Sequence, residues 1–83
     1  MKILYFAWVR QKVGRGEETV ERTAGLRTVG DLAAQLHARG GGYADAFGDM
    51  SRLRAAVNQA HAAFDAAIAD DDEIAFFPPV TGG

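Results

Sequence analysis

The sequence opens on an apolar run that strongly constrains the fold. Residues 3–9 are rich in aromatic and β-branched side chains, and the run is apolar on both of its alternating faces. One face would carry Ile3, Tyr5, Ala7 and Val9, and the other would carry Leu4, Phe6 and Trp8. Such a run is typical of a strand in the interior of a sheet, so we expect neighbouring strands and a second covering surface.

The chain is short for a sheet of this kind. With 83 residues it has room for one small domain, in which folding removes only a modest fraction of the surface from water. The formal charge of −2 gives no electrostatic reason to bind nucleic acid, which requires clustered Lys and Arg. The lack of cysteine excludes disulfides and fits a reducing compartment, so we expect a cytoplasmic protein. The opening run is too short to span a membrane.

One amphipathic helix is predicted to cover the sheet. A glycine-rich turn at residues 14–16 leads into a short polar strand over residues 18–23. Thr28 then fits the N-cap of a helix, and Asp31, three residues later, fits a capping box. This helix ends at Gly40. Its apolar stripe consists of Val29, Leu32, Ala33 and Leu36.

Weaker patterns follow the helix. Tyr43 and Phe47 are spaced for a single helical turn that closes one end of the core. Residues 53–58 alternate like a half-buried strand, and Asn58-Gln59 forms a turn. The Ala-rich segment that follows is compatible with a short strand near residues 61–64 or with a helix.

Residues 73–77 form the last predicted strand. The acidic run before it marks a tight turn, and Pro78 and Pro79 end the strand because proline cannot donate a hydrogen bond to a ladder. The elements therefore follow the order strand, strand, helix, strand, short strand, strand. This order predicts an α+β domain over residues 1–77, in which one main helix covers one face of a mixed sheet.

The sequence predicts neither a metal site nor an intrinsic cofactor. His37 and His61 have no catalytic partner at a recognisable spacing, so a surface or partly packed role is favoured for both. The acidic run at residues 70–73 lacks the spaced ligands of a cation-binding loop. Residues 39–42 are glycine-rich, but they follow a helix rather than opening one, which argues against a phosphate cradle.

The end of the sequence is the strongest functional candidate. The six residues after the last strand are Pro78, Pro79, Val80, Thr81, Gly82 and Gly83. Extended, such a segment reaches on the order of 20 Å. The prolines lower the entropy lost on binding, and the glycines, lacking Cβ, can thread a narrow channel. The alternative is an ordinary disordered chain end. If the segment is functional, its reactive group is the terminal carboxylate of Gly83.

A second candidate is the sheet face that the helix leaves uncovered. We expect the core beneath the helix to include Ile3, Tyr5, Leu53, Val57, Ile74 and Phe76. Pleat alternation then places a partner-binding set on the opposite face, consisting of Leu4, Phe6, Trp8, Ala75 and Phe77. An exposed apolar face beside the tail would be a docking patch. The alternative is that loops of the same chain bury it.

The ending DDDEIAFFPPVTGG resembles that of the small, sulfur-carrier subunits of molybdopterin synthases, a family of ubiquitin-like β-grasp proteins. The opening ILYFAWVRQKVG and the segment LRAAVNQ are similar to the first and third strands of that family. Two positions depart from its pattern. Asp71 stands where glycine is frequent, and Gln11 stands where an acidic residue is common.

The resemblance implies a β-grasp fold and a defined chemistry. In this family an ATP-dependent, E1-like enzyme adenylates the carboxylate equivalent to that of Gly83, and sulfur is then installed to give a thiocarboxylate. The large synthase subunit uses this sulfur to build the molybdopterin dithiolene, in an assembly of two small and two large subunits. The small subunit is thus part of a sulfurtransferase but is not catalytic alone, and ATP is used by its partner. The alternatives are a sulfur carrier of the thiamine pathway and a ubiquitin-like modifier or binding module.

Overall fold

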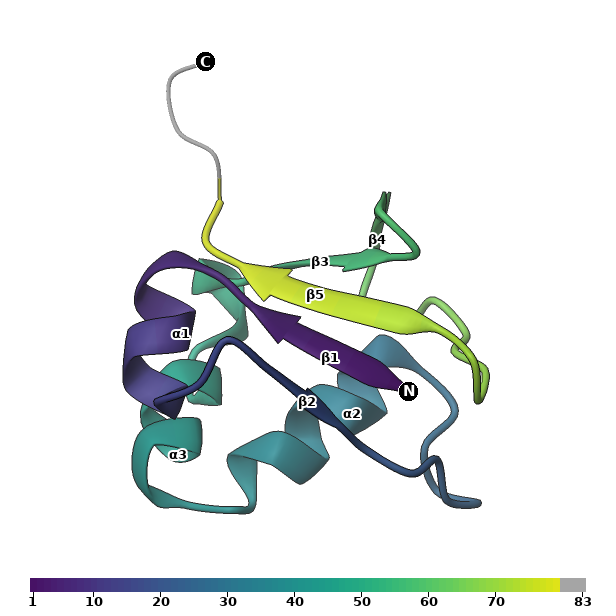
Figure 1. The fold of residues 1–83 in the computed structure, drawn as a ribbon, viewed down its shortest axis with the longest axis horizontal. Coiled ribbons are helices and arrows are strands. Elements are labelled where there is room, and N and C mark those ends of the chain that lie inside the picture. The colour runs from purple at the N-terminus through teal and green to yellow at the C-terminus, as the bar shows by residue number, and fades with distance from the viewer. Residues whose placement is uncertain (80–83) are drawn as a thin grey trace.

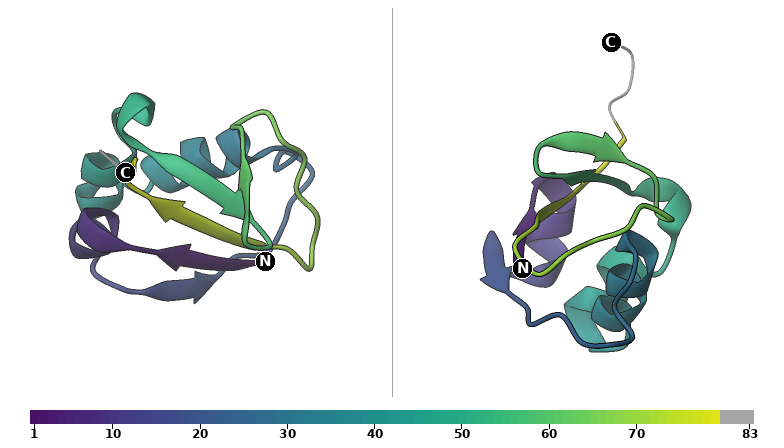
Figure 2. Two further views of the ribbon diagram at one scale, coloured as in Figure 1. Left: turned by 90° about the horizontal axis from the view of Figure 1, so that it is seen from above. Right: turned by 90° about the vertical axis from the view of Figure 1, so that its right-hand side faces the viewer.

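The computed structural model describes residues 1–79 as a five-stranded mixed sheet with helices on one side. In chain order the elements are β1 (Lys2–Tyr5), α1 (Ala7–Val13), β2 (Glu17–Thr19), α2 (Val29–His37), α3 (Gly41–Phe47), the 3₁₀-helix η1 (Met50–Arg52), β3 (Arg54–Val57), β4 (Ala60–Ala62) and β5 (Glu73–Phe77). The sheet order is β2-β1-β5-β3-β4. β1 and β5 are parallel, and the other pairs are antiparallel. Figure 1 and Figure 2 show α2 and α3 below one face of the sheet, with α1 at the end where β1 and β5 finish.

The opening apolar run divides into a strand and a helix. β1 ends at Tyr5 and α1 begins at Ala7, so the prediction of one strand over residues 3–9 is wrong in its second half. Ala7 has a φ of 54°, in the left-handed region, and this turns the chain out of the sheet after Phe6. Gly14, with a φ of 91°, ends α1 by donating its N–H to the carbonyl of Arg10. A short run that is apolar on both faces satisfies a strand and a buried helix equally well.

The capping box predicts the start of α2 correctly. The Asp31 N–H donates to Thr28 Oγ1 over 3.1 Å, and the Thr28 N–H donates to Asp31 Oδ2 over 3.0 Å. The four residues of the predicted apolar stripe are all buried. α2 ends at His37, and Gly40, with a φ of 76°, turns the chain into α3. α3 is the helical turn predicted from Tyr43 and Phe47.

The core lies between the sheet and the helices, as the alternation predicts. Five of the six predicted core residues are buried, and Val57 is half-buried. On the helix side, Phe47 stacks edge to face against Phe76, with 4.9 Å between ring centroids. Edge-to-face pairs of this kind add to the stability that burial provides.

The second half of the chain follows the predicted order of strands. Asn58 and Gln59 have φ of 51° and 70°, as a two-residue hairpin turn requires, and this turn joins β3 to β4. The ambiguous Ala-rich segment is therefore a strand at its start. β5 has the predicted bounds, whereas β2 ends four residues before its predicted end at residue 23. The acidic run forms a turn, in which the Asp72 carboxylate accepts from the Ala69 N–H over 2.7 Å and from Asn58 Nδ2 over 2.9 Å.

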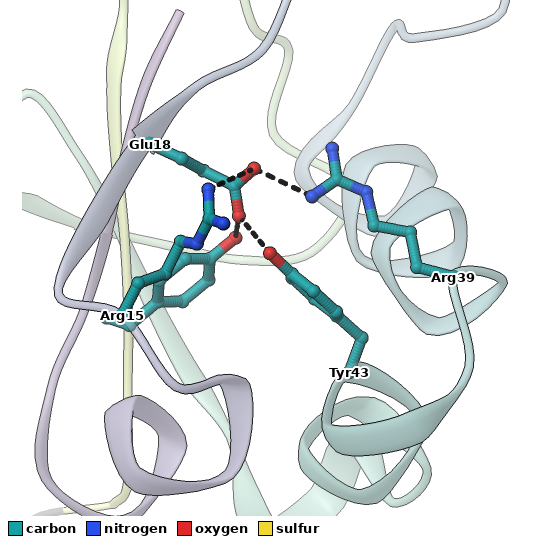
Figure 3. A network of polar contacts seen from close by, with 5 residues as sticks. Arg15, Glu18, Arg39 and Tyr43 are labelled. Atoms are coloured by element: carbon teal, nitrogen blue, oxygen red, sulfur yellow. Dashed lines mark hydrogen bonds and ion pairs between the residues drawn. The ribbon is translucent and has the colours of Figure 1, made fainter.

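Glu18 ties the edge strand β2 to the helices (Figure 3). Its carboxylate accepts hydrogen bonds from Tyr5 Oη at 2.8 Å, Tyr43 Oη at 2.5 Å and Arg39 Nη1 at 2.7 Å. Arg15 Nη1 lies 3.9 Å from the same carboxylate, whose side chain is only 8% exposed. Burial alone would raise the pKa of Glu18, but the hydrogen bonds from Arg39 and the two tyrosines outweigh it and lower that pKa below 4.5. Burial and the neighbouring Glu18 carboxylate raise the pKa of Tyr5.

Helices α1 and α3 approach each other closely at Gly42. A Cβ at this position would lie 1.8 Å from the carbonyl oxygen of Lys12, which is backbone and cannot rotate away. Only glycine allows this contact, so residue 42 sets the distance between the two helices.

We predict that Gly42→Ala lowers the free energy of unfolding by at least about 2 kcal/mol, because a Cβ forces α1 and α3 apart. Alanine is otherwise the better helix former, so intrinsic propensity alone predicts the opposite sign. The measurement is urea unfolding followed by circular dichroism. Gly25→Ala is the control, since a Cβ at Gly25 meets nothing within 4 Å. Equal effects of the two substitutions would contradict the close contact.

We predict that Glu18→Gln lowers the free energy of unfolding by about 2 kcal/mol at neutral pH, since the amide cannot accept from three donors as the carboxylate does. The folded-state pKa of Glu18 is lowered, so its stabilisation is present above pH 4.5 and is lost as the pH falls through the folded-state pKa. The difference between wild type and variant should therefore shrink in acid. Glu17→Gln, at an exposed pair with Lys2, is the control and should change little. A Glu18→Gln loss no larger than that of this control would refute the role of the network.

Candidate functional site

The tail begins at the middle of the sheet. β5 lies between β1 and β3, and its last residue, Phe77, pairs with Arg54. Pro78 and Pro79 follow directly, and both are half-buried. They end the strand as predicted. Val80, Thr81, Gly82 and Gly83 lie outside the described residues, so the extended tail and the role of the Gly83 carboxylate stay predictions.

Strand register assembles an apolar row on the sheet face opposite the helices. Leu4 pairs with Ala75, and Ala75 pairs on its other side with Ala56, so the three residues lie in one row across β1, β5 and β3. Leu4 and Ala75 are half-buried, as is Phe77 in the next row, whereas the intervening residues of β5 are fully buried. This alternation matches the predicted division between core and outer face. We call this row, together with Phe77, Phe6 and His61, the outer face.

Phe6 extends the outer face toward α1. Its side chain is 49% exposed, the most exposed large hydrophobic among residues 1–79. Its N–H donates to the carbonyl of Phe76 over 3.1 Å, so Phe6 lies beside the end of β5 although it follows the last residue of β1. An exposed aromatic side chain beside the first tail residue is suited to contact a partner that receives the tail.

Trp8 does not lie on the sheet face. A strand that continues to Val9 would place it there, but Trp8 belongs to α1. It is half-buried against the core, and the guanidinium carbon of Arg52 lies 4.9 Å from its ring centroid. Its predicted part in partner binding is untested, and its predicted position is wrong.

His61 is a residue of the outer face that sequence reasoning treated as an ordinary surface side chain. It pairs with Ala56 in the β3–β4 register, and its ring lies 5.4 Å from that of Phe77 in an edge-to-face arrangement. The position depends on the register of β4, which lay within the ambiguous Ala-rich segment. His37 lies on α2, on the helical side of the sheet, so the two histidines do not form one site.

The described residues include neither a cluster suited to a metal ion nor a helix suited to cross a membrane. Within residues 1–79, no three His, Asp or Glu side chains are grouped so that they could hold a metal ion. None of the helices in that range combines the length and the apolar composition needed to cross a bilayer.

The fold defines the class of the protein. A mixed sheet with its first and last strands parallel at the centre and a helix packed across one face is the ubiquitin-like β-grasp. The crystal structure of SAMP1, small archaeal modifier protein 1, from Haloferax volcanii superposes with a TM-score of 0.71 at 27% identity, and the match covers 100% of this chain and 98% of that one.

The chain belongs to the ThiS family, whose sequence pattern matches residues 3–83. It is 45% identical to the molybdopterin synthase sulfur carrier subunit of Escherichia coli, over 100% of this chain and 99% of the relative. The sulfur carrier subunit of Haemophilus influenzae is 32% identical over the same shares of the two chains. These matches confirm the family and the fold expected from the sequence.

We predict that Phe6→Asp weakens binding to the large molybdopterin synthase subunit, the partner that the resemblance implies, by about 10-fold or more. The cause is a charge placed in an apolar contact, while the exposure of Phe6 keeps the cost to folding small. Phe77→Ala should weaken binding in the same direction. Isothermal titration calorimetry measures the affinity. Ala34→Asp adds the same charge on the exposed side of α2 and should leave the affinity unchanged. If Phe6→Asp binds as tightly as this control, the outer face is not the docking site.

Proposed function

We propose that this chain is the sulfur-carrier subunit of a molybdopterin synthase. The observation that carries the proposal is the 45% identity to the Escherichia coli sulfur carrier subunit across the full length of this chain. The ending FFPPVTGG, which follows β5 directly, supports it. The apolar outer face beside the first tail residue supports it as well, because a carrier must dock on the enzymes that modify and use its tail.

The proposed chemistry begins at the carboxylate of Gly83. A carboxylate is a poor electrophile because its negative charge is spread over the carbonyl group. Attack of a carboxylate oxygen on the α-phosphorus of ATP releases pyrophosphate and gives an acyl-adenylate. Hydrosulfide delivered by the sulfur donor then attacks the carbonyl carbon, AMP departs with the carboxylate oxygen as a good leaving group, and the sulfur loses its proton. The product is a thiocarboxylate. In this proposal the activating enzyme supplies the nucleotide site and the catalytic side chains.

The second proposed step takes place in the synthase. The thiocarboxylate sulfur attacks a carbon of the molybdopterin precursor held by the large subunit and displaces an oxygen substituent, which forms a thioester. Water then hydrolyses the thioester, so the sulfur stays on the precursor and the Gly83 carboxylate is restored. This chain contributes the activated atom and its position. Gly82 and Gly83 have no Cβ that would obstruct a narrow channel. Pro78 and Pro79 restrict the base of the tail, which lowers the entropy lost when the tail enters the channel.

A ubiquitin-like protein modifier is the second candidate. The observation that favours it is the similarity to small archaeal modifier protein 1 of Haloferax volcanii. The two functions diverge after activation, because a carrier passes on sulfur whereas a modifier passes its own carboxyl group to a lysine amine. The products are a thiocarboxylate in the first case and an isopeptide-linked adduct in the second.

We predict that the chain, incubated with ATP, the activating enzyme and a sulfur donor, gains the mass difference of sulfur replacing oxygen at Gly83. Deleting Gly83, or adding one residue after it, should abolish this gain and leave the unfolding midpoint almost unchanged. Intact-mass spectrometry and thermal unfolding are the two measurements. Gly25→Ala, which keeps the tail, should load like wild type. Sulfur loading of the Gly83 deletion would overturn the proposal, and isopeptide adducts in place of loading would favour the modifier.

A further inference from the structure

Three exposed arginines lie around the end of the sheet from which the tail departs. They are Arg10, Arg52 and Arg54, and we call them the arginine rim. The chain as a whole carries a formal charge of −2, whereas these three residues form a local cluster of positive charge. The rim has no role in the core, because all three residues are exposed.

Each rim residue is placed by a different element at the same end of the sheet. Arg54 begins β3 directly opposite Phe77, and its Nη1 donates to the carbonyl of Leu53 over 2.8 Å. Arg52 is the last residue of η1, which leads into β3. Its guanidinium lies over the ring of Trp8, a residue of α1, and α1 packs against β5. These two arginines therefore lie on the β3 side of the point where the tail begins.

Arg10 lies on the β1 side of the same point. Its guanidinium carbon is 3.3 Å from where a Cβ of Gly16 would be, so the Arg10 side chain lies against the backbone at Gly16. The carbonyl of Gly16 accepts from the N–H of Tyr5, the last residue of β1, over 2.9 Å. Arg10 is also one helical turn beyond the exposed Phe6. The rim thus flanks the end of β5 on both sides.

Three of the four other arginines have a carboxylate partner, whereas the rim arginines, like Arg27, have none within residues 1–79. Arg22 pairs with Asp70 at 2.6 Å, and Arg39 pairs with Glu18 at 2.7 Å. Within residues 1–79, no carboxylate oxygen lies within 4 Å of a rim guanidinium. Hydrogen bonds from Ser51 are the main cause that lowers the pKa of Asp49, and the charge of Arg52 is only a minor cause.

Acidic side chains gather at the opposite end of β5. Asp70, Asp71 and Asp72 precede the strand and Glu73 begins it, whereas the rim surrounds its other end. The rim contacts that do exist, to backbone carbonyls and to an aromatic ring, leave the guanidinium charges in place. Asp70 is paired with Arg22, but the other three carboxylates have no ion-pair partner within residues 1–79, so acidic groups predominate at this end of β5 and basic groups at the rim.

We infer that the arginine rim binds acidic side chains around the entrance of the partner cleft that receives the tail. The inference rests on the proposed function and names the charge that its partner must carry. The rim is continuous with the outer face through Phe77 and Phe6, so one docking event covers both. Guanidinium groups pair with carboxylates in a bidentate geometry, and charge complementarity of this kind mainly accelerates association. A polyanion such as nucleic acid fits less well, because the acidic end of the same small domain repels it.

The test compares three single charge reversals that differ in position. Arg10→Glu and Arg54→Glu lie in the rim, and Arg27→Glu, just before α2, makes the same charge change on an exposed residue outside it. Stopped-flow fluorescence would measure association with the large molybdopterin synthase subunit and with the activating enzyme of the same organism. Thermal unfolding confirms that each variant is folded.

At low salt each rim reversal is expected to lower the association rate constant for at least one partner about 10-fold, and Arg27→Glu less than about 2-fold. The difference should largely vanish near about 1 M salt, where charges are screened beyond about 3 Å. Dissociation rate constants should change less than association rate constants.

The outcomes separate this inference from the proposed function. If wild type binds and loads sulfur, but rim and Arg27 reversals associate alike at low salt, the inference is overturned and the proposed function stands. If wild type binds neither partner, the proposed function fails and the inference fails with it. If the rim reversals abolish binding of a single-stranded oligonucleotide while partner association is unchanged, the rim serves nucleic acid and the inference is wrong.

Discussion

The parallel pairing of β1 with β5 is the constraint on which the rest of the structure depends. It joins the two ends of the chain, with Ile3 opposite Ile74 and Tyr5 opposite Phe76. Closing a loop of nearly the whole chain costs conformational entropy, which the buried side chains of these two strands must offset. Because β5 is then flanked on both sides, its last residue is held at the middle of the sheet, and the tail begins from a fixed point.

Pleat alternation in β5 separates the core from the proposed docking surface within five residues. Ile74 and Phe76 point into the core and are fully buried, while Ala75 and Phe77 lie on the outer face and stay half-buried. A small domain has too little chain to cover both faces of its sheet completely, and the residues of the second face are accordingly only half-buried. The same strand thus anchors the fold and carries the surface that we propose for docking, up to the residue before Pro78.

Local signals in the sequence predicted the elements that depend on neighbouring residues. The Thr28–Asp31 capping box fixed the start of α2, and the prolines fixed the end of β5, because each acts through hydrogen bonds within a few positions. The path after Tyr5 was not predictable, since it depends on a left-handed φ at Ala7, where the sequence offers no glycine. The same error misplaced Trp8. His61 joined the outer face only through the register of β4, which is set by distant pairing.

The charged residues fall into two groups, those paired within the fold and those of the arginine rim. The nearly buried Glu18 carboxylate pairs with Arg39 and lies near Arg15. These charges therefore contribute to contacts within the fold. Pairing at one exposed arginine adds little to stability, because solvent screens the charges and ordering long side chains costs entropy. Leaving the rim without such partners therefore costs the domain almost nothing. It also keeps the rim charges available for a partner surface, where water is excluded and each pair counts for more than it does in solvent.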